Sequence, residues 1–229
     1  MAEHTAGATR LVWDLPLRAT HWALVLCVAG SWATHYAGAG WSQWHARCGY
    51  AVLVLVVFRV LWDFVGTRHA RFASFLRGPG AVLAYLRGGR AGAGHNPLGA
   101  LSVLALLALL LLQAATGLFA NDEIAFTGPF YGWAQGDWSE RLTSLHHRNA
   151  DWLLALIALH VAAVLWYGFV KRRALVRAML TGRRPAQEVP DGEEIAGSRL
   201  PLAIVLVLLL AGLLALAIRA APEAVISYY

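Results

Sequence analysis

Five long apolar blocks constrain this chain more than any other feature of its sequence. The chain has 229 residues, of which 59% are hydrophobic and only 14% are charged. A helix that crosses a bilayer needs about 20 mostly apolar residues. Five windows meet this requirement: Arg18–Tyr36, Ala46–Gly66, Pro97–Phe119, His147–Val170 and Leu200–Ile218. The sequence therefore predicts an all-α membrane protein, in which helices satisfy the backbone polar groups within the lipid.

Basic residues gather in the segments that would share one side of the membrane. Most of the 19 lysine and arginine residues precede the first window, separate the second from the third, or follow the fourth. The loop between the third and fourth windows is instead mainly acidic, with Asp122, Glu123, Asp137 and Glu140. The positive-inside rule then places the N-terminus in the cytoplasm and the C-terminus in the periplasm of a bacterial inner membrane. The net charge of +6 reflects this topology and anionic lipid, not nucleic acid.

The chain divides into three predicted parts. Residues 1–180 would form a four-helix core, residues 181–199 a cytoplasmic linker, and residues 200–229 a fifth transmembrane helix with a short outer tail. Between the second and third windows, "RHARFASFLRGPGAVLAYL" is expected to lie at the cytoplasmic interface as an amphipathic piece. Cys27 and Cys48 form neither CxxC nor CxxCH, which excludes covalent c-type haem attachment.

Histidines inside the apolar blocks are the main functional signal, because an ionisable side chain is costly in hydrocarbon. The stretch "LHHRNADWLLALIALH" contains His146, His147 and His160. Positions 14 apart differ by roughly 40° around a helix, and positions 13 apart by roughly 140°. His146 therefore shares a face with His160, about 21 Å away along the axis, whereas His147 does not.

Two imidazoles at two depths need partners at matching depths on other helices. His21 opens the first block, level with His160, and His45 opens the second block, level with His146. Such couples can hold two b-type haems in a helical bundle, with one imidazole on each face of each iron. His35 also lies 14 residues after His21, so spacing alone does not choose between His35 and His45 for the outer site.

Further residues fit the same arrangement. Gly49, four residues after His45, would leave room for a porphyrin beside the backbone. Arg59 shares the face of His45 near the inner couple, where it could neutralise a haem propionate. His95 and Asn96 would open the third helix, with Asn96 as its cap and Pro97 as its first residue. Alternatively, His95 and Asn96 contact a propionate or a quinone.

Several motifs together resemble the bacterial di-haem cytochrome b family, which includes the cytochrome b subunits of nickel–iron hydrogenases and formate dehydrogenases and small prokaryotic cytochromes similar to b561. They are "VWDLPLRATHW", "HARCGYAVLVLVVFRVLWDFVG", "RFASFLRGPGAVLAYL", "GHNPLGALSVLALL" and "LHHRNADWLLALIALH", within about Leu11 to Arg184. The resemblance implies a four-helix haem-binding bundle, to which this chain adds a fifth helix. It also implies iron ligands at His21 and His160 and at His45 and His146, which favours His45 over His35.

Iron with two axial histidines has no open position for a substrate, so such a site suits electron transfer. We therefore expect a respiratory-chain protein that exchanges electrons between the quinone pool and a periplasmic partner, as a quinone-linked oxidoreductase subunit. The partner would be a cytochrome c or a dehydrogenase- or hydrogenase-type subunit, docking at Asn121–Arg141 or Ala220–Tyr229. Two alternatives are a histidine-based metal transporter and a membrane-anchor subunit without electron transfer.

Overall fold

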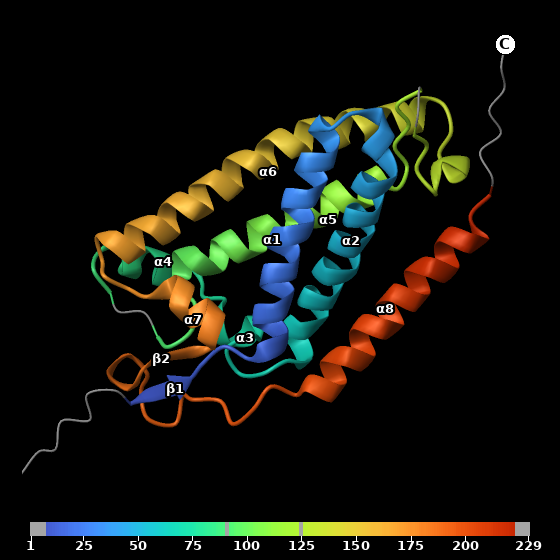
Figure 1. Cartoon of the computed structure of the whole chain (residues 1–229). Coiled ribbons are helices and arrows are strands. Elements are labelled where there is room, and N and C mark those ends of the chain that lie inside the picture. Colours follow the sequence, from blue (N-terminus) through green and yellow to red (C-terminus); the bar gives the residue numbers. More distant parts are fainter. Residues whose placement is uncertain (1–7, 90–91, 124–125, 223–229) are drawn as a thin grey trace, which may run out of the picture. The chain divides into compact units, whose positions relative to one another are not determined.

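The computed structural model is mostly helical (Figure 1), and it describes residues 8–89, 92–123 and 126–222. The predicted outer tail beyond residue 222 therefore lies outside the described residues. The long helices are α1 (Leu15–Tyr36), α2 (Ser42–Val65), α5 (Pro97–Gly117), α6 (Asp137–Phe169) and α8 (Leu200–Ala220). The short elements are β1 (Thr9–Leu11), η1 (Ala39–Trp41), α3 (Phe72–Phe75), α4 (Pro79–Leu86), η2 (Tyr131–Trp133), α7 (Leu175–Thr181), β2 (Arg183–Pro185) and η3 (Ala186–Glu188).

All five predicted windows are helical, and four described helices are long and apolar enough to cross a membrane. These four are Ala39–Val65, Pro97–Gly117, Asp137–Phe169 and Leu200–Ala220. The helix α1 has 22 residues but is not among them, because His, Trp, Ser and Thr side chains interrupt its apolar run. The helical class is thus confirmed together with four spanning candidates, whereas a total of five spans remains a prediction.

The fourth predicted window is shorter than the helix that contains it. We predicted a span from His147, but α6 begins ten residues earlier, at Asp137. The added turns carry Asp137 and Glu140, and acidic side chains stabilise the positive end of a helix dipole. A hydropathy window does not detect such polar turns, so the window began after His146, whereas the helix extends nine residues before it.

The chain forms two compact units. The first unit comprises residues 1–20, 59–105 and 158–203, and the second comprises residues 21–58, 106–157 and 204–229. Each of the five long helices contributes residues to both units.

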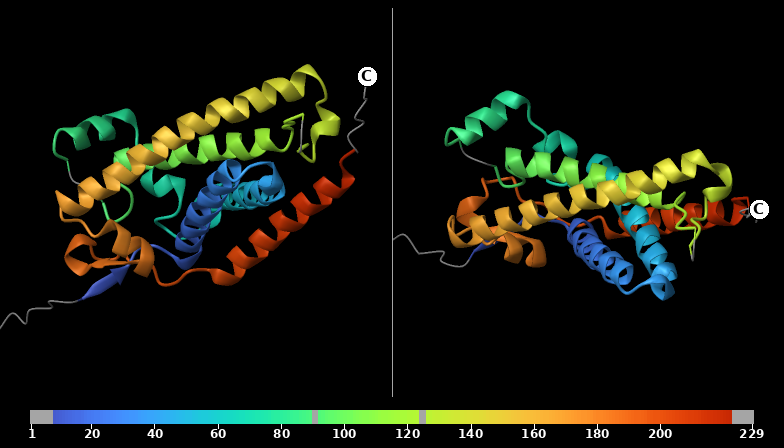
Figure 2. Two further views of the ribbon diagram at one scale, coloured as in Figure 1. Left: turned by 45° about the horizontal axis from the view of Figure 1, so that its top comes forward. Right: turned by 90° about the horizontal axis from the view of Figure 1, so that it is seen from above.

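In the first unit, β1 pairs with β2 in an antiparallel ribbon, with Arg10 opposite Arg184 (Figures 1 and 2). The left-handed Gly182 ends α7 just before β2, with a φ of 79° that a glycine adopts at little cost. The Gly182 carbonyl accepts the backbone N–H groups of Val12 and Trp13, at 2.8 and 3.0 Å. These bonds fix the entry to α1 against the end of α7.

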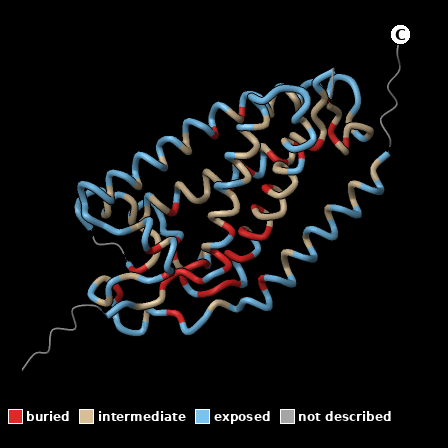
Figure 3. The backbone as a smooth tube through the Cα atoms, viewed as in Figure 1, coloured by how far each residue is buried: buried red, intermediate tan, exposed pale blue. Residues whose placement is uncertain are grey.

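Asp14 is the centre of a buried polar cluster in the same unit. Its carboxylate is 1% exposed and caps α1 by accepting the Leu17 N–H at 2.7 Å. Trp62 Nε1 donates to the same carboxylate at 3.1 Å, and the Thr67 hydroxyl donates to it as well. The cluster therefore joins the end of α2 to the start of α1, where Figure 3 shows many buried residues.

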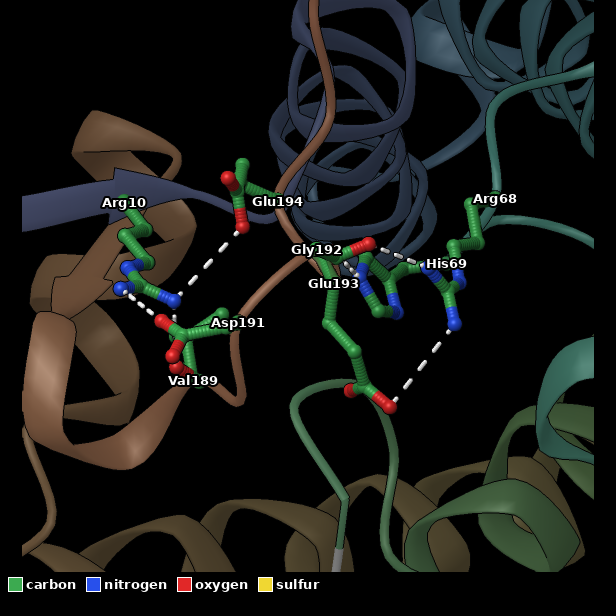
Figure 4. Close-up of polar contacts among 8 residues, drawn as sticks. All are labelled: Arg10, Arg68, His69, Val189, Asp191, Gly192, Glu193 and Glu194. Carbon is green, nitrogen blue, oxygen red and sulfur yellow. Dashed lines mark hydrogen bonds and ion pairs between the residues drawn. The ribbon is translucent and has the colours of Figure 1, made fainter.

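Residues 189–195, called the strap below, belong to the first unit and contact Arg10 and Arg68 of that unit (Figure 4). Arg10 donates to the Val189 carbonyl at 3.0 Å and forms an ion pair with Asp191. The strap ends with the Ile195 N–H bonded to the Leu11 carbonyl at 2.9 Å. The segment that we predicted as a linker thus also contributes a strand and a tied loop, a role that its Pro- and Gly-rich composition does not reveal.

In the second unit, α1 and α2 run antiparallel through η1, and α5 and α6 are joined by the loop that contains η2 (Figures 1 and 2). Ser139 on α6 donates to the Phe119 carbonyl at 2.8 Å, and Thr143 accepts the Asn121 N–H at 3.1 Å. These bonds hold the loop against the first turns of α6. Most of α8 is exposed (Figure 3), with only 6% of its apolar window buried, as expected for a helix that faces lipid or a partner.

Candidate functional site

A cavity of about 570 Å³ lies in the second unit, and residues from α1, α2, α5 and α6 line it. Its size falls in the range of small-molecule and cofactor sites. Most of its wall is apolar, and four imidazoles are the ionisable groups of interest. These are His35, His45, His146 and His147.

His45 and His146 are held in the same way, each by a backbone carbonyl of a neighbouring helix. His45 Nδ1 lies 2.9 Å from the Ser31 carbonyl, and His146 Nδ1 lies 2.9 Å from the Gln113 carbonyl. Since a carbonyl oxygen only accepts, each Nδ1 carries the hydrogen and each Nε2 keeps its lone pair. Metal-ligating histidines are typically oriented in this manner.

The separation of these two rings suits a metal ion between them. A metal about 2 Å from each of two imidazole nitrogens places the ring centroids roughly 6 Å apart. The centroids of His45 and His146 are 6.2 Å apart. The donor set and the cavity therefore fit the haem iron that the sequence resemblance implies. The spacing permits this couple but does not single it out, because the His35 and His45 centroids are 6.1 Å apart as well. The two ligand assignments remain predictions.

Glycines leave room around this couple. A Cβ added to Gly49 would have no atom within 4 Å, so the cavity wall is open beside α2, as we expected for a porphyrin. A Cβ added to Gly117 on α5 would instead lie 3.0 Å from His146 Cε1. Gly117 therefore allows the His146 ring to approach α5, a contact that sequence analysis missed.

His35 and His147 border the same cavity. The His35 ring centroid lies 6.1 Å from that of His45, and the His35 ring packs edge-on against Tyr36 at 5.1 Å. The His147 ring lies 6.1 Å from His146. Helical phase separated His147 from His146, yet both line the cavity because it is wide enough to reach two adjacent positions of α6.

Two hydrogen-bonded side-chain amides, those of Asn149 and Gln113, support the site. Asn149, which is 3% exposed, donates to the Leu109 carbonyl at 2.9 Å and to Gln113 Oε1 at 2.7 Å. Because the Gln113 carbonyl also orients His146, this pair fixes α6 against α5 next to the imidazole. Asn149 follows His146 by three positions, a helical spacing that could have identified it in the sequence.

His21 belongs to the second unit and His160 to the first. His21 packs edge-on against Trp22, with ring centroids 5.3 Å apart. The predicted inner couple of His21 and His160 remains a prediction.

Arg59 has a closer partner than the propionate we predicted. In the first unit it forms a buried ion pair with Asp63, one helical turn later on α2. Asp63 is 1% exposed, and its second oxygen has no hydrogen-bond partner among the described residues. The Arg–Asp spacing of four residues is the sequence signal for this pair, and binding of a propionate by Arg59 remains a prediction.

The start of α5 agrees with its prediction. Asn96 Oδ1 accepts the Gly99 N–H at 2.7 Å, and α5 begins at Pro97. Asn96 also donates to the Tyr167 hydroxyl at 3.3 Å. His95 lies between the rings of Trp13 and Phe75, with centroids 4.7 and 4.8 Å away. The helix cap is thus confirmed, and contact with a propionate or a quinone remains a prediction.

Comparison with known proteins adds independent information. A family model described as prokaryotic cytochrome b561 matches residues 12–182. The chain is 25% identical over 166 residues to a probable Ni/Fe-hydrogenase B-type cytochrome subunit of Rhizobium leguminosarum bv. viciae, covering 64% of this chain and 70% of that protein. It is 24% identical over 217 residues to a protein of the same name from Azotobacter chroococcum mcd 1, covering 76% and 87%.

Proposed function

The chain belongs to the prokaryotic cytochrome b561 family, and from this premise we propose that it carries electrons across the membrane between two haem b groups held by four histidines. Membership makes it a haem b protein of membrane electron transfer. The number of haems, their ligands, the five spans and the orientation with the N-terminus in the cytoplasm are parts of the proposal.

The paired orientation of His45 and His146 is the observation that carries it. Both rings donate Nδ1–H to a backbone carbonyl at 2.9 Å, and both border one mostly apolar cavity. When bound there, haem b supplies one-electron chemistry at its iron. The protein would contribute fixed imidazoles, walls that exclude water, and space beside Gly49. His21 and His160 would form the second couple on the strength of the family resemblance and the spacing of 14 residues.

The names of the relatives support a proposal for the redox partner. Their names describe subunits of nickel–iron hydrogenases. We propose that a hydrogenase-type or similar redox subunit exchanges electrons with this chain on the periplasmic side and that quinone does so within the membrane. A cytochrome c is the alternative periplasmic partner that we propose for this chain.

The haem content of purified variants tests the assignment. The wild-type chain should contain two haem b per polypeptide by the pyridine haemochrome assay. His146→Ala should lower this to one, whereas the adjacent His147→Ala should keep two. Two haems in His146→Ala would refute the outer site, and a wild-type protein without b-type α-bands would refute the function.

The choice between His35 and His45 needs its own pair of variants. His45→Ala should lose one haem and His35→Ala should keep both, because the described bonds orient His45 through the Ser31 carbonyl. The reverse result would assign the outer ligand to α1. Electron flow from a reduced partner to quinone that survives His160→Ala would favour the membrane-anchor alternative.

A further inference from the structure

A second cavity, of about 520 Å³, lies in the first unit, and neither His45 nor His146 lines it. Its wall is formed by α3, α4, the segment before α5 and the strap. The polar and charged side chains that line it are Arg68, His69, Ser74, Arg77, Tyr85, His95 and Glu193. Unlike the mostly apolar wall of the first cavity, its wall is about half polar and half apolar.

Positive charge exceeds negative charge in this lining, with two arginines and one carboxylate. Arg68 donates to the Gly192 carbonyl at 2.6 Å and lies 3.8 Å from the Glu193 carboxylate (Figure 4). Arg77 donates to the Ser74 carbonyl at 3.3 Å, within its own turn. Since a guanidinium has five N–H donors, both arginines retain donors for an anion.

Neighbouring groups shape the cavity around these charges. His69 Nε2 donates to the Glu193 carbonyl at 2.6 Å, which fixes the ring orientation (Figure 4). A Cβ added to Gly94 would lie 3.2 Å from His69 Nδ1, so this glycine keeps the wall open next to the ring. Tyr85 shares a hydrogen bond of 2.6 Å with Tyr167, and burial together with this bond raises the pKa of Tyr85 to about 12. Its hydroxyl therefore stays neutral beside the arginines.

Apolar groups line the rest of the same cavity, including Phe75 of α3 and Ala81 and Ala84 of α4. Leu76, which is 38% exposed, lies between two lining residues, Phe75 and Arg77. A cationic pocket with this apolar wall matches an amphiphile with an anionic head, because a free phosphate would gain nothing from the apolar side chains.

We propose that this cavity binds the phosphate group of an anionic phospholipid, with the acyl chains lying along Phe75, Leu76 and the alanines of α4 that line the cavity. Arg68 and Arg77 would hold the phosphate by charge-assisted hydrogen bonds. Basic pockets at the cytoplasmic ends of transmembrane helices commonly take such headgroups. Which leaflet supplies the lipid depends on the membrane orientation given in the proposed function. The existence of the binding site does not depend on that orientation.

Binding of short-chain lipids to the purified haem-loaded full chain tests this proposal. The delipidated protein would be titrated with dioctanoyl phosphatidylglycerol, with dioctanoyl phosphatidylcholine and with inorganic phosphate, and binding would be followed by native mass spectrometry and by the thermal midpoint. Phosphatidylglycerol should bind and raise the midpoint. Equal binding of phosphatidylcholine, or inorganic phosphate that binds as well as phosphatidylglycerol, would overturn the assignment.

Two arginines that flank α4 provide a matched pair of variants. Arg77→Gln should weaken phosphatidylglycerol binding at least about tenfold, since its only described side-chain bond lies within its own turn. Arg87→Gln should leave it unchanged, because Arg87 is exposed at the end of α4 and does not line the cavity. Equal affinity of the two variants would overturn the proposal. Haem content, measured in parallel, should stay at the wild-type value in both, so that failure here is distinguishable from failure of the proposed function.

Discussion

Trp62 and Thr67 of the first unit both donate to the buried carboxylate of Asp14. His45 and His146 of the second unit instead bond to backbone carbonyls through one ring nitrogen and leave the other at a cavity. The polar side chains near Asp14 thus satisfy each other inside the protein. Each imidazole instead keeps its Nε2 lone pair for a ligand that is not part of the polypeptide. We infer that changes around Asp14 should reduce stability with little effect on haem, and that changes at the cavity should do the reverse.

The largest effect should come from filling the cavity. Gly49→Leu places a side chain where a Cβ meets no atom within 4 Å, so the helix should fold normally. The leucine would occupy the space proposed for a porphyrin and lower the haem content from two to one per chain. The pyridine haemochrome assay measures this. Gly168→Leu on α6 is the control, because it too meets open space but does not line the cavity. Two haems in Gly49→Leu would place the cofactor elsewhere.

Removing the Asp14 carboxylate tests whether the polar cluster of the first unit serves stability and not haem binding. Asp14→Ala eliminates a helix cap and removes the buried acceptor to which Trp62 and Thr67 donate. We expect a loss of about 3 kcal/mol in the free energy of unfolding, at the level of one or two unsatisfied buried groups plus a cap.

Thermal or denaturant unfolding in detergent measures this loss, and Asp14→Asn should recover part of it. Ser198→Ala is the control, since it removes only an exposed bond to the Leu15 N–H at the same helix start, for a change within about 0.5 kcal/mol. An Asp14→Ala protein of unchanged stability but lower haem content would reverse the roles of the two units.

The sequence predicts these two regions unequally. Apolar blocks are local features, so the sequence predicts five windows, four of which are spanning candidates in the structure. The matched depths of His45 and His146 likewise predict two residues that the structure brings to one cavity. The partners of Asp14, at positions 62 and 67, are distant in the sequence, and no periodicity relates them. The strap was missed for the same reason, because its contacts with Arg10 and Arg68 depend on tertiary structure.

A smaller loss of stability should follow from removing the hydrogen bonds that Asn149 donates beside the cavity of the second unit. Asn149→Leu keeps the side-chain volume but removes the donor to Gln113 Oε1 and to the Leu109 carbonyl. We expect a loss of roughly 1–2 kcal/mol with both haems retained, as for a buried acceptor that loses its donor. Trp152→Leu, at a side chain 71% exposed on the same helix, should change stability much less. Loss of haem in Asn149→Leu would show that the amide pair positions His146 and does not merely stabilise the fold.

The smallest effect should be a pH dependence confined to the first unit. Burial alone would raise the pKa of Glu188, but bonds from Arg184 at 2.6 Å and Arg173 at 2.8 Å lower it below its ordinary value of 4.5. A carboxyl whose folded pKa is depressed contributes stability above its ordinary pKa and loses it as the pH falls through the folded pKa. The thermal midpoint of the wild-type protein should therefore fall more steeply below about pH 4.5 than that of Glu188→Gln. At neutral pH the two should differ by at most about 1 kcal/mol, because the ion pairs are only partly buried. Arg173→Gln should move the acid transition to higher pH, and Arg177→Gln, an exposed arginine of α7, should not. Parallel pH profiles for the wild type and Glu188→Gln would show that these ion pairs do not contribute to the stability of the first unit.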